Sequence, residues 1–114
     1  MRLKVYYIDD EPDLLMTFME LFSSAFVDVM GFTCVDQFLK AIETSPPDLV
    51  FMDYCLHETN ADEISKKLDP SIPKAVITGK FETDIVAFGY DASFPKPFTV
   101  EQIQEFITRY LKSG

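Results

Sequence analysis

The 114-residue sequence has no tryptophan, only four glycines and only two cysteines. Cys34 and Cys55 lack the CxxC spacing of a redox or metal site and are too few for a disulfide scaffold, so we expect buried, unreactive thiols in a reducing compartment. No apolar run approaches the roughly 20 residues of a membrane-spanning helix, and no signal sequence precedes the first strand-like segment. These absences predict a cytoplasmic protein rather than a secreted or membrane protein.

Positive charge is also scarce in this chain. The 10 basic residues are outnumbered by 19 acidic ones, and the resulting formal net charge of −9 disfavours direct contact with nucleic acid or an anionic membrane. Apolar residues nevertheless make up 47% of the chain and include eleven phenylalanines, which is enough for one hydrophobic core. We therefore expect a single domain over residues 1–114.

Five short apolar segments have the composition of buried strands, and they are Leu3–Ile8, Val27–Phe32, Leu49–Asp53, Lys74–Thr78 and Ala92–Pro95. They alternate with segments in which apolar residues recur every three or four positions, as in amphipathic helices; these are residues 12–26, Val35–Thr44, Ala61–Leu68, Thr83–Phe88 and Thr99–Lys112. This alternation predicts an α/β protein with a flavodoxin-like (βα)5 fold, in which helices cover both faces of a doubly wound parallel sheet.

Two of the predicted strands carry residues that suit the edge of a sheet. Val27–Phe32 alternates in polarity and contains a glycine, and Ala92–Pro95 contains a proline, which cannot donate a backbone hydrogen bond. Placing these two strands outermost gives the order 2-1-3-4-5. In such a sheet, ligands bind at the carboxyl ends of the strands, near the switch point between strands 1 and 3.

Polar residues follow the strands at this same edge. Asp9 and Asp10 come after the first strand and Asp53 ends the third, where a buried charge costs free energy unless another group pairs with it. Thr78 ends the fourth strand, and Lys96 follows the fifth. We expect these side chains to form one site.

Three carboxylates at one edge repel one another, and two such charges ~4 Å apart cost roughly 4 kcal/mol at an intermediate dielectric. A hard divalent cation such as Mg²⁺ removes this cost, because it prefers oxygen ligands and retains several waters. Asp10 and Asp53 offer two carboxylates, a loop carbonyl near Cys55 offers a third ligand, and Asp9 offers an acceptor for a bound water.

Lys96 and Thr78 complete a site that suits a phosphoryl group. The Lys96 ammonium is a point charge for one phosphoryl oxygen, and the Thr78 hydroxyl can donate a hydrogen bond to another. A carboxylate held beside them is a nucleophile toward phosphorus and would form an aspartyl phosphate.

These residues resemble the receiver domains of two-component response regulators over Lys4 to about Lys112. The shared features are Asp9-Asp10-Glu11-Pro12, then Asp53, Thr78-Gly79 and Lys96-Pro97-Phe98, in this order and at family-like spacings on a (βα)5 pattern. The resemblance implies that Asp53 is the phosphoacceptor, that Asp9 and Asp10 hold Mg²⁺, and that Thr78 and Lys96 contact the phosphoryl group. It also implies a cis Lys96–Pro97 bond.

The resemblance further implies a set of partners. The phosphoryl donor would be a sensor histidine kinase, a histidine phosphotransfer protein or a small acyl phosphate. The output would pass to a downstream protein target or to an effector domain missing from this chain. Such a domain promotes its own phosphorylation and dephosphorylation but is not an enzyme in the usual sense.

The sequence departs from the family pattern at several positions. His57 and Ala61 replace the proline and glycine that usually lie four and eight residues after the acceptor. Ser93 lies three residues before the lysine, where the switch aromatic is usual, and strand alternation directs the neighbouring Phe94 to the opposite face. We expect an intact phosphorylation site with an altered readout in the Ser93–Phe94 region.

Two other functions are compatible with parts of this sequence. A degenerate receiver would act as a phosphorylation-independent binding module, as Ser93 and His57 suggest, although the complete acidic set argues against it. A metal-dependent phosphatase or phosphotransferase of the haloacid dehalogenase type would use an aspartate after strand 1 with a second acid two residues on. Here Asp9 and Asp10 are adjacent, and no cap domain is present to enclose a substrate.

Overall fold

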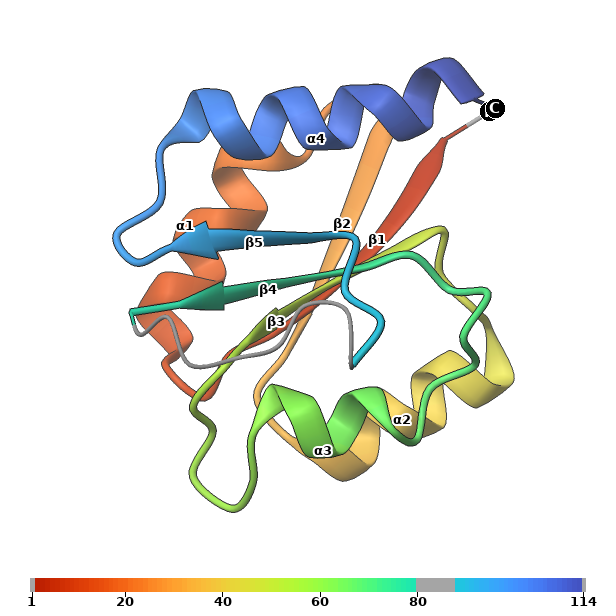
Figure 1. Ribbon diagram of the computed structural model, residues 1–114. Helices are drawn as coiled ribbons and strands as arrows, with labels where there is room; N and C mark the ends of the chain where they lie inside the picture. Colours follow the sequence, from red (N-terminus) through yellow and green to blue (C-terminus); the bar gives the residue numbers. More distant parts are fainter. Residues whose placement is uncertain (1, 80–87, 114) are drawn as a thin grey trace.

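The computed structural model describes residues 2–79 and 88–113 of the chain (Figure 1). Within these ranges, five parallel strands form one sheet in the order β2-β1-β3-β4-β5. The strands are β1 (Leu3–Ile8), β2 (Val27–Phe32), β3 (Leu49–Asp53), β4 (Lys74–Thr78) and β5 (Ala92–Pro95), and the helices are α1 (Pro12–Phe22), α2 (Val35–Thr44), α3 (Ala61–Ser65) and α4 (Val100–Ser113). The predicted α/β class and strand order are confirmed.

Helices cover both faces of the sheet. Figure 1 shows α1 and α4 on one face and α2 and α3 on the other. Every residue of β3 and β4 is buried, which explains why the apolar residues of these strands are consecutive and do not alternate with polar ones. On the α1 and α4 face, the Phe51 ring lies 5.2 Å from the Phe18 ring and 5.9 Å from the Phe106 ring, centroid to centroid. Phenylalanine therefore fills this core, as its abundance indicates.

The edge strands are the two that the sequence predicted. Pro95 lies in β5, which has a neighbour on one side only. Gly31 lies in β2, where a Cβ atom on the glycine would come within 2.7 Å of Leu15 Cγ and 2.9 Å of Met19 Sδ on α1. The glycine therefore allows α1 to approach the sheet closely.

Several helix limits differ from the prediction. The helix α3 ends at Ser65 instead of Leu68. In the turn that follows, each N–H bonds to the carbonyl three residues earlier instead of four, from Lys67 N–H to Ile64 O at 2.9 Å and from Leu68 N–H to Ser65 O at 3.2 Å. The last helix begins at Val100, and the Thr99 side chain caps it by accepting a hydrogen bond from Gln102 N–H at 3.3 Å.

The prediction of buried thiols is wrong. Cys34 and Cys55 are both free and exposed, because each lies in a loop at the edge of the sheet rather than in a strand or the inner face of a helix. Cys34 precedes α2, and Cys55 forms an isolated bridge with Asn60 in the loop between β3 and α3. The helix predicted at Thr83–Phe88 lies outside the described residues, except for Phe88.

Candidate functional site

The register of the central strands brings the three predicted acids together. Ile8 of β1 pairs with Met52 of β3, so the residues that follow each strand are neighbours at the carboxyl edge. Carboxylate oxygens of Asp9, Asp10 and Asp53 all lie within 4.8 Å of one another. Asp9 and Asp53 are buried, and Asp10 is partly exposed.

Two hydrogen bonds hold the Asp9 carboxylate. The Tyr7 hydroxyl donates to one carboxylate oxygen at 2.5 Å, and the Glu11 backbone N–H donates to the other at 3.0 Å. Burial, the hydrogen bond to Asp9 and the nearby carboxylates raise the pKa of Tyr7 well above its ordinary value, so its hydroxyl remains a donor. Tyr7 was not predicted from the sequence; the signal available was its position two residues before Asp9, on the same face of the extended chain.

Lys96 supplies positive charge to this cluster. Its ammonium nitrogen lies 3.2 Å from a carboxylate oxygen of Asp53, and its backbone N–H donates to Thr78 O at 3.1 Å. Burial lowers the pKa of Lys96, but the charge of Asp53 and its hydrogen bond raise it, and the net result lies above the ordinary value. The Lys96–Pro97 peptide bond is cis, as the resemblance implied.

One lysine does not neutralise three acids. Burial and the charges of Asp9 and Asp10 raise the pKa of Asp53, Lys96 opposes them, and the net pKa is about 6. The site therefore carries an excess of negative charge next to several carboxylate oxygens, which fits a hard divalent cation such as Mg²⁺.

The remaining predicted residues lie around this cluster in different ways. Asp53 pairs with Ile77, so the buried Thr78 at the end of β4 lies at the same edge of the sheet. The imidazole Nε2 of His57 lies 3.3 Å from an Asp10 carboxylate oxygen, although the His57 side chain is 78% exposed. Cys55 lies in the loop after β3, and the use of its carbonyl as a metal ligand stays a prediction.

Ser93 and Phe94 lie on opposite faces of β5. Phe94 pairs with Ile77 and packs against Phe106, with ring centroids 5.5 Å apart, on the α1 and α4 face. Ser93 pairs with Val76, whose side chain belongs to the core on the α2 and α3 face. The prediction that Phe94 lies on the face opposite to position 93 is confirmed, and the effect of Ser93 on the readout stays a prediction.

The sequence matches the protein-family model for the response regulator receiver domain over residues 5–108. The chain belongs to this family. This receiver domain is 25% identical to Sporulation initiation phosphotransferase F of Bacillus subtilis (strain 168) over 118 residues, which cover 97% of this chain and 95% of that protein.

Solved receiver domains share the fold of this one. The receiver domain of the Francisella response regulator 1452 superposes with a TM-score of 0.88 at 17% identity, over 99% of this chain and 100% of that chain. The chemotaxis response regulator CheY4 of Vibrio cholerae gives a TM-score of 0.86 at 17% identity, over 96% and 99% of the two chains. These structures support the (βα)5 architecture assigned to this receiver domain.

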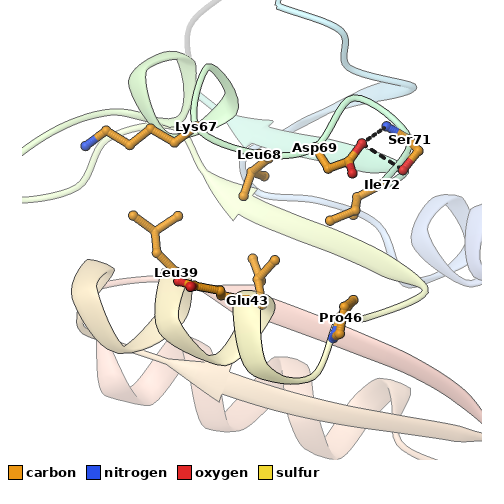
Figure 2. A pocket seen from close by; sticks show the side chains of 9 residues that line it. Leu39, Glu43, Pro46, Lys67, Leu68, Asp69, Ser71 and Ile72 are labelled. Carbon is orange, nitrogen blue, oxygen red and sulfur yellow. Dashed lines mark hydrogen bonds between the residues drawn. The ribbon is translucent and has the colours of Figure 1, made fainter.

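A separate hollow of about 620 Å³ lies between α2 and the turn that follows α3 (Figure 2). Leu39 and Glu43 on α2 face Leu68 and Ile72 across it. Because these segments lead into the amino ends of β3 and β4, the hollow lies at the edge of the sheet opposite the acidic cluster.

Across residues 2–79 and 88–113, none of the helices combines the length and apolar character needed to cross a membrane.

Proposed function

We propose that this receiver domain accepts a phosphoryl group on Asp53 and thereby switches a protein-interaction surface. The observation that carries the proposal is the meeting of three carboxylates within 4.8 Å, with the Lys96 ammonium 3.2 Å from Asp53. The name of its Bacillus subtilis relative, a sporulation initiation phosphotransferase, supports a role in phosphoryl transfer. The whole chain, residues 1–114, forms the receiver in this proposal.

The roles of the individual residues follow from their positions. An Asp53 carboxylate oxygen attacks phosphorus, the new O–P bond forms, and the P–N bond of a donor phosphohistidine breaks with its electron pair passing to the imidazole nitrogen. Lys96 and Thr78 bind phosphoryl oxygens as charge builds up on them. Asp9, Asp10, Asp53 and the Cys55 carbonyl would hold Mg²⁺, which would neutralise charge on the transferring group.

The donor and the output in this proposal are those that membership of the receiver-domain family implies. A sensor histidine kinase or a histidine phosphotransfer protein supplies the phosphoryl group, and a small acyl phosphate can replace it. We infer a cytoplasmic location from this donor. A downstream protein or a separate effector domain receives the signal, and the domain's own catalysis is limited to gaining and losing its phosphoryl group. Nothing in the described residues favours the phosphorylation-independent binding module.

Acetyl phosphate with Mg²⁺ tests the proposal, with intact-mass spectrometry as the measurement. Wild-type protein should gain one phosphoryl group, and Asp53→Asn should gain none. Asp28→Asn changes an exposed carboxylate on β2 and should behave as wild type. Chelation of Mg²⁺ with EDTA should abolish uptake. Equal uptake by wild type and Asp53→Asn, or no uptake by wild type while Mg²⁺ still binds, would contradict the proposed function.

A further inference from the structure

One buried carboxyl group lies outside the acidic cluster and has no role in the chemistry above. Asp62, in the first turn of α3, is only 8% exposed. One of its carboxyl oxygens accepts a hydrogen bond from the Tyr54 hydroxyl at 3.0 Å, and the other accepts one from the Tyr90 hydroxyl at 2.8 Å. A buried carboxyl group costs free energy that an apolar side chain would not, so this arrangement favours a specific role over simple packing.

Tyr54 connects this carboxyl group to the phosphoacceptor strand. It directly follows Asp53, its N–H donates to Ile77 O at 2.9 Å, and its carbonyl accepts from Ala61 N–H at 2.9 Å. The first turn of α3 is therefore attached to Tyr54 by a backbone hydrogen bond and by a side-chain hydrogen bond. These two bonds connect the position of α3 to the chain immediately after Asp53.

Tyr90 connects the same carboxyl group to β5. Tyr90 is 6% exposed and lies two residues before the strand. A second contact strengthens this connection, because the Ser65 hydroxyl of α3 donates to Phe88 O at 2.7 Å. The far end of β5 is followed by Lys96, which contacts Asp53 at 3.2 Å. Both ends of β5 are thus linked to the carboxyl end of β3, one through Lys96 and the other through the tyrosine pair.

We propose that Asp62 is a positioning residue that couples the state of Asp53 to Phe88–Tyr90 through the Tyr54 and Tyr90 hydroxyls. The inference rests on the proposed phosphorylation of Asp53. A phosphoryl group on Asp53 draws Lys96 away from the carboxylate oxygen and repositions the chain that follows β3. Because both hydroxyls share one carboxyl group, this change passes through α3 to the segment that enters β5.

This route explains how a receiver with Ser93 can still report its phosphorylation. Tyr90 lies three residues before Ser93, and its ring belongs to the core on the α2 and α3 face, the face on which Ser93 pairs with Val76. The phosphorylation signal therefore reaches the start of β5 without an aromatic side chain at position 93.

Hydrogen exchange of the full chain with and without beryllofluoride and Mg²⁺ tests the coupling, since beryllofluoride binds a carboxylate as a phosphoryl analogue. Tyr54→Phe and Tyr90→Phe each remove one hydroxyl and keep the ring. Tyr6→Phe is the matched control, because its buried hydroxyl donates to Ser45 O at 2.7 Å at the opposite edge of the sheet. Exchange is followed in peptides covering residues 61–65 and 88–91.

In the wild type, beryllofluoride should change exchange in both peptides. Tyr90→Phe should reduce the ligand-induced change at residues 88–91 at least threefold and preserve the change at 61–65, with beryllofluoride affinity within threefold of wild type. Tyr54→Phe should reduce the change in both peptides, and Tyr6→Phe should match the wild type. Asp62→Leu removes both acceptors but fills the space with an apolar side chain, and it should also lose the response at 88–91.

The outcomes separate this inference from the proposed function. If wild-type protein does not bind beryllofluoride, the proposed function fails and the coupling fails with it. If wild-type protein binds and responds, but Tyr54→Phe and Tyr90→Phe keep the full response at residues 88–91, the coupling alone is wrong. An equal loss in Tyr6→Phe would show a general loosening of the fold, and it too would overturn the coupling.

Discussion

Asp53 lies 3.2 Å from a lysine ammonium, yet the pKa of its carboxyl group is raised to about 6. At this residue, burial and the charges of Asp9 and Asp10 outweigh the attraction of Lys96. The residue that we propose as nucleophile therefore ionises less readily than an ordinary aspartate in the absence of a cation. Metal binding would relieve this local excess of negative charge, and the additional negative charge of an aspartyl phosphate would make the cation and Lys96 more important.

The stability of the metal-free protein should depend on the ionisation of Asp53. Its pKa is raised from the ordinary value of 3.8 to about 6 in the fold. Between these values the folded state binds a proton that the unfolded state has lost, so the free energy of unfolding falls as pH rises from about 4 to above 6. Asp53→Asn should therefore be more stable than wild type at pH 7, by about 1–3 kcal/mol, with a smaller difference at pH 4.

Urea unfolding followed by circular dichroism in EDTA measures this difference across the pH range. Asp28→Asn, which changes an exposed carboxylate away from the acidic cluster, should keep the wild-type pH dependence. Parallel curves for wild type and Asp53→Asn would contradict the raised pKa.

The sequence predicted the acids and the lysine of the site because each follows a recognisable strand, and parallel strands end at one edge of the sheet. It did not predict the hydrogen bond from Tyr7 to Asp9 or the pairing of Asp62 with Tyr54 and Tyr90. Those contacts depend on how side chains pack between elements that are distant in sequence. Neither the apolar periodicity of a helix nor the position of a strand end specifies such contacts.

Among the elements, β2 and α1 show how one residue sets the distance between a helix and the sheet. Gly31 allows α1 to pack closely, since a Cβ atom there would lie 2.7 Å from Leu15 Cγ and 2.8 Å from Leu15 Cδ1. Leu15 itself is buried in the core beneath α1. The side chains of Leu15 and Met19, or the helix that carries them, would have to shift to accommodate a larger residue.

Gly31→Ala should therefore destabilise the fold by about 1–3 kcal/mol through overpacking. Gly79→Ala is a matched control, because among the described residues no atom lies within 4 Å of the Cβ position at Gly79. Urea midpoints of the two variants measure the difference. Equal midpoints would show that α1 adjusts without loss of stability and that the fold does not require its close approach to β2.

The order of the strands could be predicted because Gly31 and Pro95 both mark edge strands, and this order is confirmed. The end of α3 could not, because Leu68 continues the apolar pattern although hydrogen bonds to Ile64 and Ser65 close a turn before it. Periodicity describes which side chains face the core, and it does not distinguish a helix from a well-packed turn. The exposed thiols of Cys34 and Cys55 were missed for a related reason, since apolar character alone does not place a loop residue in the core.

For the whole molecule, the net charge of −9 and the clustering of three acids at one edge act in the same direction. Repulsion opposes the compact state, and a cation bound at the acidic cluster would offset part of it. The fold therefore brings together carboxylates that would favour the binding of a cation to the folded state.

Mg²⁺ should raise the melting temperature in a concentration-dependent way, because a ligand that binds only the folded state stabilises it by mass action, by about 2.7 kcal/mol at 100 times Kd. Asp10→Asn should lose most of this stabilisation. Thermal unfolding at Mg²⁺ concentrations from zero to about 20 mM measures this stabilisation. NaCl at matched ionic strength is the control. Equal stabilisation of Asp10→Asn and wild type would show that the effect is general screening.

The central claim is that a side-chain oxygen of Asp53 captures phosphorus in the acidic cluster. The most direct measurement is to phosphorylate the protein with acetyl phosphate and Mg²⁺, reduce the acyl phosphate with borohydride and map the peptides by mass spectrometry. The account predicts conversion of Asp53, and of no other acid, to homoserine. Conversion at Asp9 or Asp10, or no conversion in protein that binds Mg²⁺, would contradict it.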